Sequence, residues 1–257
     1  MLAFNPAPDI YLPPAMKVFV IIPAAGLGTR MTSAPSARGK QAAPSKQFTE
    51  LGGIPILMLT LRQFAALPEI SGICVALRAD EISKFRSRLE KDGKDILQKK
   101  LQLVEGGEHR QGSVANALAA IAAAENDIVL VHDAVRPFVT AEIIHEVIRA
   151  AEKYGAAIAG TPAVDTVKQV ERTAEGALIK TTIPRERVVM AQTPQGFRYG
   201  LLKQAFDDAA ADGFTGTDEA SLVERGRHPV AVVMGSPRNI KITTPADLQL
   251  AEHFLKR

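Results

Sequence analysis

Short, mostly apolar runs recur along this chain and alternate with segments of helical periodicity. Strands are predicted at Val18–Ile22, Gly72–Leu77, Leu101–Glu105, Ile128–Val131, Ala156–Thr161 and Val230–Val233. Helices are predicted at Pro55–Ala66, Glu81–Lys91, Gly112–Ala124, Ala141–Tyr154, Gly200–Ala211, Asp218–Arg225 and Pro245–Leu255. A strand that is apolar on both sides must be buried on both faces. The pattern therefore predicts an α/β fold in which helices cover both faces of a mostly parallel sheet.

Composition narrows the class of protein. The chain has 257 residues, of which 46% are apolar, enough for one large α/β domain or two small ones. No apolar run approaches the ~20 residues of a membrane span, so no membrane partner is expected. The net charge of +3 suits a small anionic substrate and is too weak to predict a nucleic-acid partner. The single cysteine, Cys74, lies in a predicted strand, which excludes an internal disulfide framework and favours a cytoplasmic location.

Three segments depart from the alternation. Residues 1–16 are rich in proline and are expected to be a flexible extension before a domain spanning 17–257. Thr32–Ser45 lacks apolar periodicity and is predicted to be a long loop, of a length that is usually functional or mobile. Residues 164–189 mix Thr, Val, Lys and Arg around Gly176, as in a projecting hairpin. Such an arm commonly pairs with a second subunit.

The first strand delivers a turn of small residues. It reads Pro23-Ala24-Ala25-Gly26-Leu27-Gly28-Thr29-Arg30. Glycines allow backbone N–H groups to approach a phosphate or a base closely, and Arg30 adds a positive charge. Met31 stands where a dinucleotide fingerprint would have its third glycine. The turn indicates nucleotide binding, and the alternative is an ordinary strand-to-helix turn with a surface arginine.

A second glycine-rich segment joins a predicted strand to an alanine-rich helix. It contains Gly107, Glu108, Arg110 and Ser113. Glycines at the end of a strand, followed by the start of a helix, favour ligand recognition, although Ser113 also fits a helix cap. His109 has no Cys or His partner at ligand spacing, so a zinc site is not expected.

The strand at Ile128–Val131 ends in His-Asp, at the edge where open α/β sheets bind ligands. Asp133 offers a carboxylate of the kind that Mg²⁺ shares with substrate phosphates, and Arg136 can bind a phosphate. The alternative is that Asp133 caps the next turn.

Three further polar residues have both a functional and a structural interpretation. Lys46 can add a second positive charge over phosphates, or it can be a solvated surface lysine. Thr217 is predicted to be the N-cap of a helix. Lys241 lies in an apolar, strand-like run and needs an anionic partner if it is buried.

Taken in order, these motifs resemble one enzyme family. The pattern comprises PAAGxGxRM at 23–31, KQ at 46–47, GGxxRxxSV at 106–114, VHDAxRP at 131–137, DTxK at 165–168, QTPQ at 192–195, TDEAS at 217–221 and NIKIT at 239–243. It is similar to the 2-C-methyl-D-erythritol 4-phosphate cytidylyltransferases of the non-mevalonate isoprenoid pathway. The resemblance runs from Val18 to about Leu255.

The resemblance implies a Rossmann-like nucleotidyltransferase fold, a homodimer joined by the arm, and dependence on Mg²⁺. It implies that CTP and 2-C-methyl-D-erythritol 4-phosphate react to give 4-diphosphocytidyl-2-C-methyl-D-erythritol and pyrophosphate. The implied catalytic residues are Arg30, Lys46, Arg185 and Lys241. The implied nucleotide contacts are Pro23, Ala24, Ala25, Gly26, Gly28, Gly107, Glu108, Arg110, Ser113 and Asp133, of which Asp133 would also hold the metal. The implied contacts to the sugar phosphate are Arg136, Thr166, Arg185, Thr217 and Lys241.

Two alternatives remain at this point. A ribitol 5-phosphate or other polyol phosphate cytidylyltransferase shares several of the motifs, but Ala-Gly-Gly is more frequent there at the opening turn, where this chain has Pro23-Ala24-Ala25-Gly26. A non-catalytic nucleotide-binding protein is expected to lack one of the charged residues. All four of those residues are present, namely Arg30, Lys46, Asp133 and Lys241.

Overall fold

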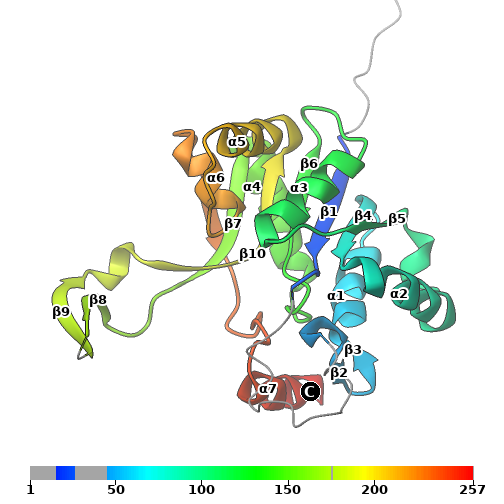
Figure 1. Cartoon of the computed structure of the whole chain (residues 1–257), viewed down its shortest axis with the longest axis horizontal. Helices are drawn as coiled ribbons and strands as arrows, with labels where there is room; N and C mark the ends of the chain where they lie inside the picture. The colour runs from blue at the N-terminus through cyan, green and yellow to red at the C-terminus, as the bar shows by residue number, and fades with distance from the viewer. Residues whose placement is uncertain (1–15, 27–44, 175, 257) are drawn as a thin grey trace, which may run out of the picture.

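A seven-stranded sheet is the centre of the molecule (Figure 1), as seen in a computed structural model that describes residues 16–26, 45–174 and 176–256. In spatial order its strands are β11 (Ala231–Met234), β7 (Ala156–Pro162), β10 (Val189–Arg198), β6 (Ile128–Val131), β1 (Val18–Pro23), β4 (Ile70–Leu77) and β5 (Leu101–Glu105). Strand β10 runs antiparallel to β6 and β7, and the remaining neighbours pair in parallel. The prediction of a mostly parallel sheet is therefore confirmed.

Helices cover both faces of the sheet, as predicted. One face packs against α1 (Ile56–Ala65), α2 (Ala79–Asp92) and α4 (Ala141–Tyr154). The other packs against α3 (Arg110–Ala120), α5 (Tyr199–Ala211) and α6 (Glu219–Arg225). Successive side chains of β1 show why its sequence is apolar throughout. Val20 and Ile22 enter the first core and Ile21 enters the second, and all three are fully buried.

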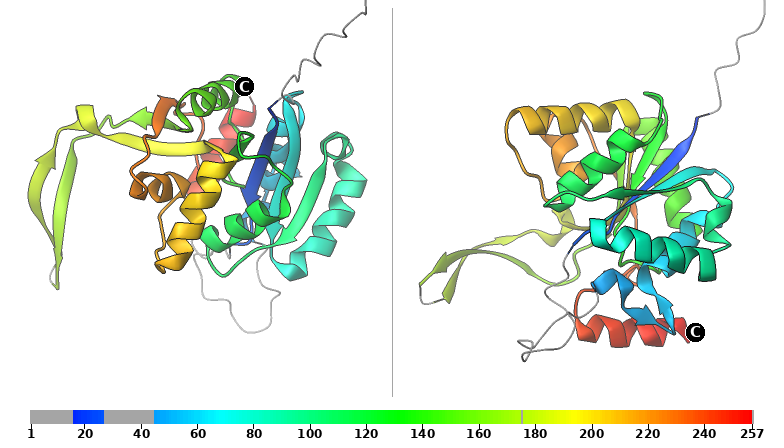
Figure 2. Two further views of the ribbon diagram at one scale, coloured as in Figure 1. Left: turned by 90° about the horizontal axis from the view of Figure 1, so that it is seen from above. Right: turned by 45° about the vertical axis from the view of Figure 1, so that its right-hand side comes forward.

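A third, smaller core lies beyond the carboxyl ends of the strands, at the bottom of Figure 1. There α7 (Pro245–Leu255) packs near a short hairpin formed by β2 (Glu50–Leu51) and β3 (Ile54–Pro55), as Figure 1 and the right view of Figure 2 show. The buried members of this core are Leu51, Ile56, Val135, Ile242 and Ala251. Helix α7 has its predicted bounds, because Thr244 and Asp247 form a capping box around Pro245.

The N-caps of α3 and α6 differ from the residues that fit a cap in the sequence. Helix α3 begins at Arg110 with His109 as N-cap, so Ser113 is not its cap. Helix α6 begins at Glu219, and its N-cap is Asp218 rather than Thr217, because the Asp218 carboxylate accepts a hydrogen bond from the Ser221 N–H at 3.0 Å.

Three other predictions differ from the structure. The predicted helix to Ala124 ends at Ala120, because Asp127 accepts the Ala124 N–H at 2.8 Å and holds that segment in a turn. Strand β10 was not predicted at all. The apolar run that contains Lys241 forms no strand, although the Ile242 N–H donates to the Val135 carbonyl at 3.0 Å.

The predicted arm is a projecting antiparallel hairpin, formed by β8 (Val167–Thr173) and β9 (Gly176–Ile183). Figures 1 and 2 show it extending away from the central sheet. Its apolar side chains Val170, Leu178 and Ile179 are 46%, 67% and 64% exposed. The hairpin therefore presents apolar surface that nothing in this chain's described residues covers.

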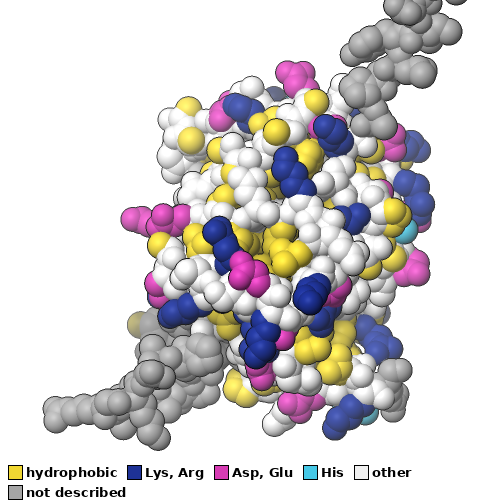
Figure 3. All heavy atoms as spheres, turned by 90° about the vertical axis from the view of Figure 1, so that its right-hand side faces the viewer, with side chains coloured by type: hydrophobic (Ala, Val, Ile, Leu, Met, Phe, Trp, Pro, Cys, Tyr) yellow, Lys and Arg dark blue, Asp and Glu magenta, His cyan; other side chains and the backbone are white. Residues whose placement is uncertain are grey.

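The surface of the body carries mixed charge. Figure 3, which views the side that lies at the right in Figure 1, shows basic and acidic side chains interspersed among neutral ones. Among the described residues, no helix is both long and apolar enough to cross a membrane. Cys74 is fully buried in β4, and burial raises the pKa of its thiol to about 12.

Candidate functional site

A cavity of about 240 Å³ lies where β1, β4, β5 and β6 end. It is lined by many of the predicted site residues. They are Pro23, Ala24, Ala25, Gly26, Lys46, Gly107, Glu108, Arg110, Ser113, Asp133 and Lys241. The carboxyl ends of neighbouring parallel strands meet at one edge of a sheet, which explains why residues far apart in the sequence converge here. We call this space the Asp133 cavity.

Two turns form one wall of the Asp133 cavity. The Ala24 N–H donates to the Ala76 carbonyl at 2.7 Å, and the Gly106 N–H donates to the Leu77 carbonyl at 2.8 Å. A Cβ atom on Gly106 would collide with the Cβ of Ala25, so only glycine allows the turns to lie this close. The Ser113 hydroxyl accepts the Gly107 N–H at 3.1 Å and so fixes the second turn.

Asp133 is the electrostatic centre of the cavity. One oxygen lies 3.0 Å from Lys241 Nζ and 3.0 Å from Arg136 Nε, and the other lies 3.6 Å from Arg110 Nε. Burial alone would raise the pKa of Asp133, but Lys241, Arg110 and Arg136 together hold that pKa well below its usual range. These three cations therefore favour the ionised form of the carboxylate.

Arg110 is held by a second carboxylate. Its Nη1 lies 2.6 and 2.8 Å from the two oxygens of Glu219, whose side chain is only 1% exposed. Burial would lower the pKa of Arg110, but Glu219 and Asp133 more than offset this and raise it. The guanidinium therefore stays charged between Glu219 and Asp133.

The segment that carries Lys241 is anchored by Asn239. The side-chain amide of Asn239 is fully buried and donates to the Thr193 carbonyl at 2.8 Å, while the backbone carbonyl of Asn239 accepts from Arg136 at 2.7 Å. Thr193 in turn accepts the Asp133 N–H through its hydroxyl at 3.1 Å. Asp133 and Lys241 are thus held in one hydrogen-bonded network, which joins β10, the 239–242 segment and the turn after β6.

Lys46 reaches the cavity from the first residue of the 3₁₀ turn η2 (Lys46–Phe48). The next residue, Gln47, is buried and donates from Nε2 to the Ala24 carbonyl at 2.6 Å. The turn is thereby tied to the wall formed by Ala24 and Ala25.

Other predicted residues are not described or do not line the cavity. Gly28, Arg30 and residues 32–44 of the predicted loop are outside the described residues, whereas Ser45 is described and buried. Arg136 lies behind Asp133 and does not line the cavity. Thr166 and Thr217 are exposed. Arg185, also exposed, donates to the Val164 carbonyl at 2.8 Å at the base of the arm, and this single chain does not bring it to the cavity.

Sequence reasoning missed several polar residues that support the site. Glu219, Thr193, Gln195 and Asn239 are nearly or fully buried. Each of these residues stands within a motif quoted above, but its hydrogen-bond partner lies far away in the sequence. Glu219 and its partner Arg110, for example, are 109 residues apart. A polar residue inside an otherwise apolar helix face was the available signal for Glu219.

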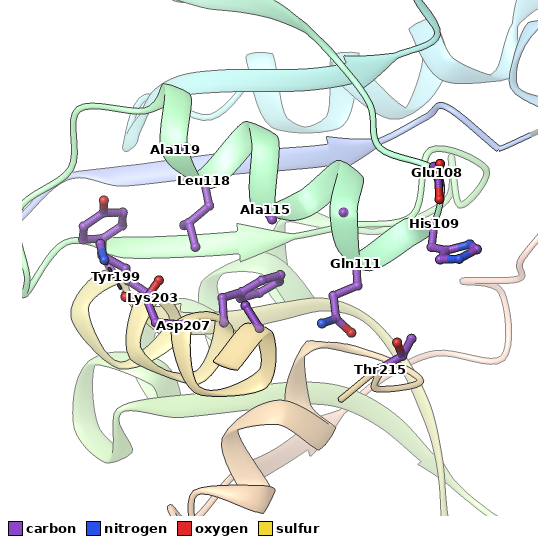
Figure 4. Close-up of a pocket in the computed structure, with 13 residues that line it drawn as sticks. Glu108, His109, Gln111, Ala115, Leu118, Ala119, Tyr199, Lys203, Asp207 and Thr215 are labelled. Carbon is purple, nitrogen blue, oxygen red and sulfur yellow. Dashed lines mark hydrogen bonds and ion pairs between the residues drawn. The ribbon is translucent and has the colours of Figure 1, made fainter. Parts of the chain in front are cut away.

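A second, larger pocket of about 620 Å³ lies between α3 and α5 (Figure 4). Leu118, Ala115 and Phe206 give it a largely apolar lining. The ammonium group of Lys203 is paired with Asp207 at 2.6 Å. Figure 4 shows Glu108 and His109 at its far end, and both also border the Asp133 cavity. The smaller cavity, which gathers Lys46, Arg110 and Lys241 around Asp133, is the better site for an anionic ligand.

The donor set at Asp133 suits a magnesium ion that is held mainly by a nucleotide. Among residues 16–26, 45–174 and 176–256, no group of three or more His, Cys, Asp or Glu could hold a metal. Mg²⁺ commonly binds through one or two carboxylates together with substrate phosphates. The ionised, cavity-lining carboxylate of Asp133 meets that requirement.

Comparisons with known proteins agree on one family. The model of the 2-C-methyl-D-erythritol 4-phosphate cytidylyltransferase family matches residues 18–257. The chain is 56% identical to the enzyme of that name from Acidobacterium capsulatum, over 94% of this chain and 98% of the relative. It is 50% identical to the enzyme of the same name from Solibacter usitatus, over 94% of this chain and 96% of the relative.

Solved structures give the same result. The crystal structure of 4-diphosphocytidyl-2C-methyl-D-erythritol synthase from Anaerococcus prevotii matches with a TM-score of 0.77 and 31% identity, over 94% of this chain and 99% of that one. The crystal structure of the 2-C-methyl-D-erythritol 4-phosphate cytidylyltransferase from Francisella tularensis matches with a TM-score of 0.75 and 34% identity, over 92% of this chain and 99% of that one.

Proposed function

We propose that the Asp133 cavity is the active site of this chain, which belongs to the 2-C-methyl-D-erythritol 4-phosphate cytidylyltransferase family. The chain transfers a cytidylyl group from CTP to that sugar phosphate in isoprenoid precursor biosynthesis. One observation carries the proposal: Lys46, Arg110 and Lys241 line one cavity, in which Arg110 and Lys241 also contact the carboxylate of Asp133. This gathers positive charge where two anionic substrates have to meet.

The chemistry requires positioning more than a protein nucleophile. An oxygen of the sugar phosphate attacks the α-phosphorus of CTP, and the bond from that phosphorus to the bridging oxygen of the pyrophosphate breaks. Both reactants are anions, so positive groups fixed in advance must offset their repulsion. We assign this role to Lys46 and Lys241, together with Arg30 and Arg185.

The two turns of the cavity wall are the proposed site of the cytosine. Ala24 and Ala25 offer a flat, small-residue surface, and the Gly106-Gly107 turn lies directly against it. Backbone groups of Gly107 and the side chains of Glu108 and Ser113 provide hydrogen-bonding partners at its edge. Pro23, Gly26, Gly28 and Arg110 are the remaining proposed nucleotide contacts.

Asp133 is the proposed ligand of Mg²⁺. When bound, the ion would neutralise part of the triphosphate charge and stabilise the departing pyrophosphate. Asp133 itself supplies one anionic oxygen, and Lys241 and Arg136 keep that side chain in place.

The sugar phosphate is proposed to bind with the help of the arm. Arg136 and Thr217 belong to the body, whereas Thr166 and Arg185 belong to the base of the arm. A two-stranded hairpin is marginally stable alone, and this one exposes Val170, Leu178 and Ile179. We therefore infer a homodimer in which the arm packs against the partner and completes its site.

A pyrophosphate-release assay with CTP and Mg²⁺ tests the function. Release is expected to be fast with 2-C-methyl-D-erythritol 4-phosphate and much slower with ribitol 5-phosphate, which serves as the matched control substrate. Faster release with ribitol 5-phosphate would assign the chain a different polyol substrate. No release with either would indicate a nucleotide-binding protein without turnover.

A further inference from the structure

Glu81 of α2 lies outside the Asp133 cavity, yet it contacts both neighbours of Lys46. The Ser45 hydroxyl donates to Glu81 Oε1 at 2.6 Å, and Gln47 Nε2 lies 3.5 Å from Glu81 Oε2. All three side chains are buried, with 8%, 8% and 1% of the surface of Ser45, Glu81 and Gln47 exposed. A carboxylate is seldom buried unless its hydrogen bonds matter.

The contacts of Glu81 fix the turn that carries Lys46. Gln47 Nε2 also donates to the Ala24 carbonyl at 2.6 Å, so one amide group joins Glu81 to the cavity wall. The Phe48 ring packs on Phe85, one helical turn beyond Glu81, with ring centroids 5.6 Å apart. The turn is therefore attached to α2 on both sides of the Lys46 backbone, while the Lys46 side chain lines the cavity.

We propose that Glu81 is a positioning residue that holds Lys46 at the Asp133 cavity through hydrogen bonds to Ser45 and Gln47. The inference rests on the proposed role of Lys46 in offsetting phosphate charge. A long, flexible lysine side chain stabilises a transition state only if its backbone is fixed, because a shift of about 1 Å can cost about 100-fold in rate. Glu81 supplies that fixation without touching a substrate.

The test compares Glu81→Ala, Glu81→Gln and the control Asp80→Ala, in wild-type and Lys46→Ala backgrounds. Asp80 is the adjacent residue on α2, is exposed and pairs only with Arg78 in the described contacts. Steady-state pyrophosphate release over a range of CTP concentrations gives kcat and the KM for CTP, and urea unfolding confirms that each variant is folded. Lys46→Ala alone is expected to lower the rate about 100-fold or more.

Glu81→Ala is expected to lower kcat by about 10- to 100-fold with little change in the KM for CTP, because a contact made in the transition state is lost. In the Lys46→Ala background it should cost almost nothing further, since the two residues act as one unit. Glu81→Gln should recover most of the rate, because glutamine can donate to the Ser45 hydroxyl and accept from Gln47. Asp80→Ala should match its parent in both backgrounds.

Three outcomes would overturn the inference while leaving the proposed function intact. They are a wild-type rate for Glu81→Ala, an equal loss in both backgrounds, and a Glu81→Gln variant as slow as Glu81→Ala. A near-normal rate for Lys46→Ala alone would instead overturn the proposed role of Lys46 and this inference with it.

Discussion

Two adjacent buried residues after β6, Asp133 and His132, differ in charge state, because the first is ionised and the second is neutral. Asp133 stays ionised because three cations surround it. His132 is fully buried, and burial lowers the pKa of its imidazole to about 4, against the weaker opposing effects of its contact with the Arg136 carbonyl and of Asp133. The neutral ring also contacts Thr193 at 3.1 Å and packs edge-on against Phe64. The histidine is thus a structural support for the turn that carries Asp133.

The lowered pKa of His132 predicts a loss of stability in mild acid. The unfolded chain takes up a proton near the ordinary histidine pKa of 6.5, whereas the folded chain does so only near 4. Unfolding is therefore favoured progressively as the pH falls from about 6.5 towards about 4. As the pH falls from about 7.5 to about 5, His132 should lower the free energy of unfolding by about 2 kcal/mol.

Urea unfolding at both pH values measures that loss. The matched control is His132→Asn, which cannot titrate and should lose about 2 kcal/mol less than the wild type over the same interval. An equal loss in the two proteins would show that His132 is not the group responsible.

At the scale of the element, the start of α6 places Glu219 against Arg110. Asp218 accepts the Ser221 N–H at 3.0 Å and also accepts from Gln195 at 2.7 Å, while the Ala220 N–H donates to Gln195 at 3.0 Å. Because Gln195 belongs to β10, the helix is fixed to the sheet at its first turn. The orientation of Glu219 therefore depends on the cap.

Replacement of Asp218 tests this arrangement. Asp218→Ala should lower the free energy of unfolding by about 1–2 kcal/mol, the cost of losing an N-cap. Thr217→Ala is the natural control, since the exposed Thr217 does not cap the helix and should change stability by less than about 0.5 kcal/mol. Equal losses measured by urea unfolding for the two variants would contradict the assignment of the cap.

The elements that the sequence predicted well are those whose local pattern decides their structure. Strands β1 and β6 are buried on both faces, so unbroken apolar runs mark them. Strand β10 was missed because its first half is exposed and its buried half carries Thr193 and Gln195, whose polar groups are satisfied by distant partners. Pairing in the site, such as Arg110 with Glu219, is likewise a property of the folded chain, which a local pattern cannot show.

At the scale of the whole molecule, the arm separates residues that the proposed reaction requires together. Arg185 stands at its base and contacts the Val164 carbonyl, whereas Lys241 lies in the Asp133 cavity. In the proposed homodimer the arm of one protomer would complete the site of its partner. Each site then needs Arg185 from one chain and Lys241 from the other.

Mixed dimers test the shared site. Arg185→Ala and Lys241→Ala homodimers should each be nearly inactive. Random mixing of the two chains should restore about a quarter of the wild-type rate, because half of the dimers are mixed and each of these has one intact site. Unmixed samples at the same total concentration are the control. Failure to recover activity after verified subunit exchange would contradict a site built from two chains.

The most direct test of the account is the rate of pyrophosphate release by Asp133→Asn, with CTP, 2-C-methyl-D-erythritol 4-phosphate and a series of Mg²⁺ concentrations. Asp212→Asn is a matched control, because Asp212 is exposed and pairs with Arg225 away from the cavity. With the fold retained by circular dichroism, Asp133→Asn should be slower by about 100-fold or more and should need more Mg²⁺ for half its maximal rate. A rate within a few-fold of the wild type, with unchanged dependence on Mg²⁺, would show that cytidylyl transfer does not depend on the Asp133 cavity.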